Sequence, residues 1–76
     1  MNKSLSNEMY QSLILKYEKE IQECKTGLLI YFNNSVGIGD HPNHLEEMDR
    51  LLINMSSAND KLNILKSTFS KLYSRL

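Results

Sequence analysis

The 76-residue chain is poor in cysteine, proline, glycine and tryptophan: it contains one cysteine, one proline, three glycines and no tryptophan. The single cysteine, Cys24, cannot form an internal disulfide, which favours a reducing compartment in which Cys24 is a small buried hydrophobe. No apolar run approaches the roughly 20 residues that span a bilayer, and the first residues lack the apolar core of a signal peptide. The sequence therefore predicts a soluble, intracellular protein of one domain with a modest core.

Sustained alternation of apolar and polar residues, which a half-buried strand needs, is also absent. Apolar residues instead recur at steps of three and four in both halves of the chain, as they do in helices that pack side by side. In the first half this spacing predicts a buried stripe made of Tyr10, Ile14, Tyr17, Ile21, Cys24, Leu28 and Tyr31. In the second half it predicts buried faces made of Leu45, Met48, Leu51, Leu52, Met55, Leu62, Leu65, Phe69 and Leu72.

Two short stretches predict interruptions of these stripes. An interior glycine costs about 1 kcal/mol against alanine, so Thr26-Gly27 predicts a kink or break. Ser57 followed by Asp60 resembles a capping box, which predicts a second break near residue 56. The predicted fold is all-α, a small antiparallel four-helix bundle with helices at about 4–25, 27–33, 42–55 and 57–74 and a loop at 34–41.

The alternative fold is a long two-helix hairpin, since the apolar spacing also runs straight through residue 56. Two stripes alone bury too little apolar surface for a stable chain of this length. The hairpin would therefore have to dimerise.

The stretch between the two halves predicts a turn that leads into a helix. Gly37 and Gly39 tolerate positive φ. Pro42 suits the first position of a helix, with Asp40 or His41 as the cap. These residues therefore indicate a turn and a helix start at about Pro42.

The same stretch gives little support to a cofactor or metal site. "GIGD" lacks the third glycine and the preceding strand of a nucleotide-binding loop. Asp40, His41 and His44 come from one short segment, whereas structural zinc sites usually take four ligands in two pairs. No serine, histidine and acid fall into recognisable catalytic roles. The sequence therefore predicts a non-enzyme that holds neither a cofactor nor a metal.

The net charge of zero hides an asymmetry along the chain. Residues 1–60 carry five basic and nine acidic side chains, whereas residues 61–76 carry four basic side chains and no acid. A basic end suits phosphates or an acidic partner, but it also suits a solvated helix face that complements the helix dipole. On one continuous helix Lys61, Lys71 and Arg75 would lie within an arc of about 80°. The candidate nucleic-acid-binding residues are Lys61, Lys66, Lys71 and Arg75.

Two segments, "FNNSVGIGDHPNHLEEMDRLL" and "SSANDKLNILKSTF", resemble the family of small proteins encoded beside the UvsW helicase of T-even-type bacteriophages. The family pattern is F-x-N-x-V-G-I-G-[DE]-H-P, then an amphipathic helix, then A-x-[DE]-K-L-x-x-L and a terminal aromatic. Asn59 departs from the acidic residue expected there in relatives. The resemblance covers about residues 30–70. The residues that carry it are Phe32, Asn34, Val36, Gly37, Ile38, Gly39, Asp40, His41, Pro42, Ala58, Asp60, Lys61, Leu62, Leu65 and Phe69.

This resemblance implies a small helical bundle, similar in shape to the nucleic-acid-binding modules appended to RecQ-type helicases. It also implies a setting in the host cytoplasm, in phage recombination, repair and replication-fork processing. The chain has no Walker A lysine motif, so the resemblance does not imply the helicase motor itself. We therefore expect a non-catalytic accessory protein that binds single-stranded or branched DNA, the UvsW helicase, or both. The alternative is a structural or adaptor helical oligomer that does not bind nucleic acid.

Overall fold

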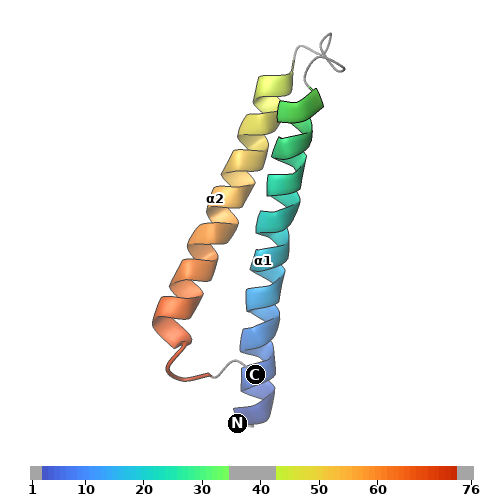
Figure 1. Ribbon diagram of the computed structural model, residues 1–76. Helices are drawn as coiled ribbons and strands as arrows, with labels where there is room; N and C mark the ends of the chain where they lie inside the picture. Colours follow the sequence, from blue (N-terminus) through green and yellow to red (C-terminus); the bar gives the residue numbers. More distant parts are fainter. Residues whose placement is uncertain (1–2, 35–42, 74–76) are drawn as a thin grey trace.

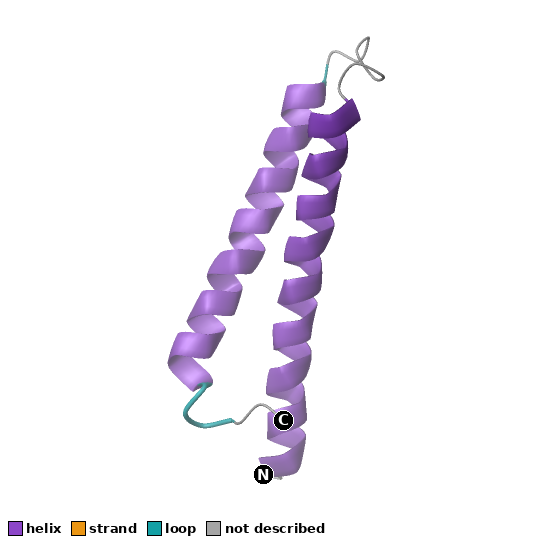
Figure 2. Cartoon of the chain, viewed as in Figure 1, coloured by secondary structure: helices purple, strands orange, loops and turns teal. Residues whose placement is uncertain are grey.

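The structure, a computed structural model, describes residues 3–34 and 43–73. These ranges hold two helices, α1 (Lys3–Asn34) and α2 (His44–Phe69), and no strand. The helices lie side by side and run in opposite directions, forming an elongated hairpin of 55 × 17 × 15 Å (Figures 1 and 2). Neither described helix combines the length and the apolar character that a membrane span requires. The predicted all-α fold is confirmed for the described residues.

The core is a single seam between the two helices. In α1 its buried and half-buried members, from Tyr10 to Tyr31, follow alternating steps of three and four, a period of about 3.5 residues that keeps a stripe facing one partner helix. Half-buried side chains from both helices and from the segment after α2 pack around Tyr10, Ile14 and Leu62. The predicted stripe of α1 is confirmed as the side that faces α2. The buried apolar residues of the described ranges are Tyr10, Ile14, Cys24, Leu28, Ala58 and Leu62.

The predicted break at Thr26-Gly27 is wrong, because α1 continues through it to Asn34. Gly27 lies where the two helices approach closely: a Cβ built on it would be 3.0 Å from Leu51 Cδ1. The lack of a side chain therefore makes room for Leu51. Close packing against α2 offsets the helix propensity that glycine loses, which is only about 1 kcal/mol.

The predicted break near Ser56 is wrong as well, because α2 runs from His44 through this stretch to Phe69. Ala58 is 1% exposed and Leu62 is 8% exposed, so the seam passes directly through the supposed capping box. A break at Ser57 would turn both residues out of the seam. The four predicted helices are thus two, and the alternative fold, the two-helix hairpin, describes these residues.

The ends of α2 also differ from the prediction. Asn43 is its N-cap residue, with no side-chain cap hydrogen bond, and the backbone N–H of Glu47 donates to the Asn43 carbonyl at 2.9 Å. The helix therefore begins two residues after the predicted start at Pro42. The loop motif residues Gly37, Gly39, Asp40, His41 and Pro42 lie outside the described residues.

At the other end α2 stops at Phe69, five residues before the predicted end. The chain turns there, and the backbone N–H groups of Leu72 and Tyr73 donate to the Phe69 carbonyl at 2.9 and 3.1 Å. The turn brings the Tyr73 ring to 5.8 Å from the ring of Tyr10, measured between centroids. This contact between the two ends of the chain, about the spacing of favourable aromatic pairs, competes with continuation of the helix.

Candidate functional site

The seam separates two flanks of the hairpin that differ in chemistry. On one flank a groove of about 340 Å³ lies between the helices. Its rim carries charged and polar side chains from both helices, so we name it the polar flank. The residues that line this groove are Glu20, Glu23, Cys24, Asn54, Ser57 and Lys61.

Lys61, one of the candidate nucleic-acid-binding residues, is engaged within the polar flank. Its Nζ atom lies 5.6 Å from the centroid of the Tyr17 ring, within the range of a cation–π contact. Glu20 accepts a hydrogen bond from Lys16 Nζ at 2.7 Å. That bond, helped by the charges of Lys16, Lys61 and Lys19, holds the pKa of Glu20 below its ordinary value of 4.5. The Lys61 charge is therefore partly balanced by its own chain.

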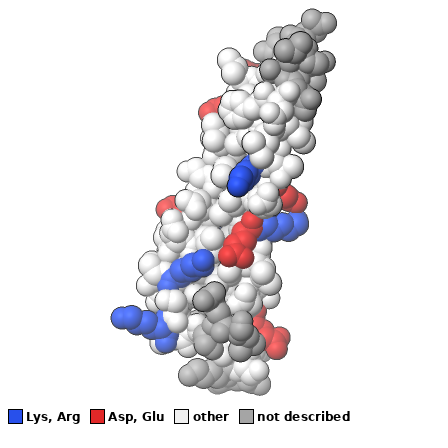
Figure 3. Space-filling view, in the orientation of Figure 1, with Lys and Arg blue, Asp and Glu red and all other residues white. Residues whose placement is uncertain are grey.

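The other candidate basic residues do not share a helix face with Lys61. Lys66 follows it by five residues, which places Lys66 about 140° further round α2. Lys71 lies in the turn beyond Phe69, and Arg75 lies outside the described residues. The predicted strip of Lys61, Lys71 and Arg75 assumed one continuous helix through these residues. Because α2 ends before Lys71, the prediction that Lys61 and Lys71 share a helix face is wrong. Figure 3 shows basic and acidic side chains scattered among neutral ones on the face in view.

Lys66 and Lys71 are candidate basic residues that lie away from the polar flank. Both are exposed, and within the described ranges neither is joined to an acid by an ion pair. Lys66 lies in the last turn of α2, where a positive charge complements the helix dipole. These two lysines could each meet a phosphate, but they do not form a continuous basic surface.

The opposite flank carries apolar side chains near the loop end of the hairpin. On α2 these recur at steps of three and four, and Leu45 and Leu52 are 80% and 52% exposed. On α1, Ile21 lines a groove of about 380 Å³ together with Leu52. Phe32 follows Ile21 by eleven residues, about three helical turns, and so shares its side of α1. Hereafter the loop-end surface comprises Ile21, Phe32, Leu45, Met48, Leu52 and Met55.

The ends of the two helices bring the parts of this surface together. The Tyr31 and His44 rings lie 5.7 Å apart between centroids. Their neighbours in the chain, Phe32 and Leu45, are therefore close to the same end of the hairpin. Among the described residues no three side chains of the metal-binding types lie together.

The sequence pattern indicated these apolar positions but placed them in a core. Leu45 and Leu52 were expected to be buried, and the structure leaves at least half of each exposed. The signal was the width of the stripe: α2 has apolar residues beyond the two per heptad that a two-helix seam can cover. The extra positions are those that form the loop-end surface.

No family model, curated protein or solved structure matches the chain. The chemistry of the surfaces and the resemblance carried by two segments are therefore what bears on function. The second of these segments lies within α2, and there Ala58 and Leu62 are buried in the seam. For these two residues the motif is explained by packing.

Proposed function

We propose that the chain is a non-catalytic accessory protein that binds a larger protein through its loop-end surface. The observation that carries this proposal is the run of apolar side chains on α2 that α1 does not cover. The partner named by the resemblance is a UvsW-type helicase, which sets the proposed role in phage DNA recombination, repair and replication. In this proposal the chain binds its partner and catalyses no reaction.

The composition of the loop-end surface suits a protein interface. Burial of a leucine or phenylalanine side chain contributes about 1.5–3 kcal/mol, and Leu45, Leu52 and Phe32 are each at least half exposed in the hairpin. Apolar anchors at the centre of an interface supply most of its binding energy. Met48 lies between Leu45 and Leu52 on α2 and Met55 follows Leu52 by three residues, and unbranched methionine side chains adapt to an irregular partner surface.

Replacement of Leu52 by glutamate tests this surface directly. A carboxylate at the centre of the surface would have to lose its water on binding, so affinity for the purified helicase should fall at least about tenfold. Biolayer interferometry with the immobilised helicase measures the change. The matched control is Ile53→Glu, which adds the same charge at a residue that is 59% exposed and points about 100° away.

The control should bind as the unmodified chain does. Equal losses for Leu52→Glu and Ile53→Glu would show that charge, and not the loop-end surface, decides binding. An unmodified chain that does not bind the helicase at all would overturn the proposed partner.

Nucleic-acid binding is the second candidate function, favoured by the exposed Lys66 and Lys71 in a segment without acidic residues. Fluorescence anisotropy with single-stranded and branched DNA should show affinity that falls as salt rises. Changing both lysines to glutamate should weaken binding and flatten the salt slope by about two. Changing Lys19 and Lys25 of α1 to glutamate alters the charge equally and should matter less. Absence of binding at low salt would remove this candidate.

A further inference from the structure

The hairpin exposes much more surface than a compact chain of its mass. Its solvent-accessible area is 5922 Å², whereas a folded monomer of 8.8 kDa is expected to expose about 4,800 Å². The Cα radius of gyration is 16.7 Å, against about 11 Å for a compact domain of 76 residues. The excess of about 1,100 Å² exceeds the roughly 800 Å² that each partner contributes to a standard protein interface.

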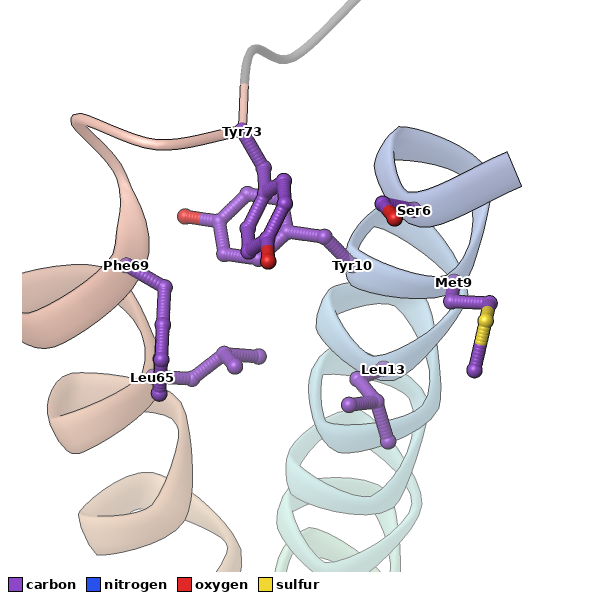
Figure 4. Close-up of a pocket in the computed structure, with 7 residues that line it drawn as sticks. All are labelled: Ser6, Met9, Tyr10, Leu13, Leu65, Phe69 and Tyr73. Atoms are coloured by element: carbon purple, nitrogen blue, oxygen red, sulfur yellow. The ribbon is translucent and has the colours of Figure 1, made fainter. Parts of the chain in front are cut away.

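Part of this excess lies at the end of the hairpin that holds the termini. The two helices are closest near the loop and diverge toward this end (Figure 1). A groove of about 210 Å³ opens there between them. Figure 4 shows Leu13 of α1 on one side of the groove and Leu65 and Phe69 of α2 on the other, while Met9, which also lines the groove, lies on the outer side of α1. The paired rings of Tyr10 and Tyr73 lie near Ser6, at one end of the groove.

A stripe of apolar side chains continues from this groove along the outside of α1. Leu5, Met9 and Leu13 follow one another at steps of four and are 52%, 55% and 39% exposed. The same three residues line a second, shallow hollow, flanked by Glu8 and Lys16. Met9 and Leu13 border both hollows, so stripe and groove form one surface. Hereafter the terminus-end surface comprises Leu5, Met9, Leu13, Leu65 and Phe69.

We propose that the terminus-end surface binds a second copy of the chain, with the two copies related by a two-fold axis. Such an interface is self-complementary when a projecting stripe lies beside a groove that can receive its copy, because each stripe then fills the partner's groove. The product is a four-helix assembly made of two hairpins. It covers the apolar surface that one hairpin leaves open.

The charges of the chain do not oppose association. The net charge of zero removes overall repulsion between copies. Of the two charged residues that flank the stripe, Lys16 is already paired with Glu20 of its own chain at 2.7 Å. The inference does not rest on the proposed function, because the loop-end surface stays open in this dimer.

Sedimentation velocity and light scattering over about 1 μM to about 1 mM chain test the proposal. The mass should rise from 8.8 kDa toward twice that value. Met9→Glu places a carboxylate in the apolar interface of both copies and should raise the dimer dissociation constant about 100-fold or more. Leu52→Glu is the matched control, since Leu52 and Met9 are 52% and 55% exposed, and it should dimerise normally. Circular dichroism checks that both variants keep their helices.

Cross-linking locates the interface independently of stability. Met9→Cys in a Cys24→Ala background should yield covalent dimers with a short bismaleimide, and Leu52→Cys in the same background should not. A chain that stays monomeric at every concentration overturns the proposal. So does a dimer that survives Met9→Glu but is lost in Leu52→Glu, or one that cross-links through position 52 and not position 9.

Discussion

Replacement of Ile14 by alanine should remove most of the stability of the chain. Ile14 is 2% exposed and packs with Tyr10 and Leu62 in the seam. Truncation of a buried isoleucine costs about 2–5 kcal/mol, the sum of lost transfer free energy and the cavity left behind. A single core in a chain of this size rarely supplies more than about 3–5 kcal/mol. The free energy of unfolding, measured by urea denaturation with circular dichroism, should therefore approach zero.

Ile53→Ala is the matched control, because the same atoms are removed where the side chain is 59% exposed. Its effect should stay within about 0.5 kcal/mol, since surface substitutions change little and alanine favours the helix. Both variants need the same chain concentration, because dimerisation would make apparent stability depend on it. If the two substitutions cost the same, the seam around Ile14 does not carry the stability.

The direction in which α1 faces its partner could be predicted from the sequence, and the number of helices could not. The steps from Tyr10 to Tyr31 define one stripe, and packing on that stripe is what a 3.5-residue period requires. The penalties at Gly27 and Ser56 are real but small and local. Whether they break a helix depends on how well the continuous helix packs against the opposite one, as Gly27 packs against Leu51. This packing joins residues that are far apart in the sequence, so no local pattern predicts it.

Burial and the helix end were mispredicted for a related reason. Phe69 and Leu72 were expected to be buried and are 39% and 58% exposed, because periodicity shows which face is apolar but not whether anything covers it. The prediction of a basic strip was wrong because it assumed that α2 continues through Lys71, whereas α2 ends at Phe69. The contact of Tyr73 with Tyr10 joins residues 63 positions apart. No sequence pattern near Lys71 predicts that contact.

Substitutions at Gly27 should change stability in opposite directions as the new side chain grows. Gly27→Ala gains up to about 1 kcal/mol of helix propensity. Its Cβ would meet Leu51 Cδ1 at 3.0 Å, while the next Leu51 atoms lie at 3.6 and 3.9 Å. Leu51 is only half-buried, so its terminal methyl can move by a few tenths of an ångström. The net effect should be stabilisation by about 0.5 kcal/mol.

Gly27→Leu should instead destabilise the chain by about 1–3 kcal/mol, because a branched side chain cannot share the space that Leu51 occupies. The control is Thr26→Leu, which adds the same side chain one residue earlier at an exposed position of α1 and should have little effect. Urea denaturation of the three variants gives the comparison. Stabilisation by both alanine and leucine at position 27 would mean that the helices do not approach closely there. Gly27 would then only lower the helix propensity of α1 and would not be needed for α2 to pack against α1.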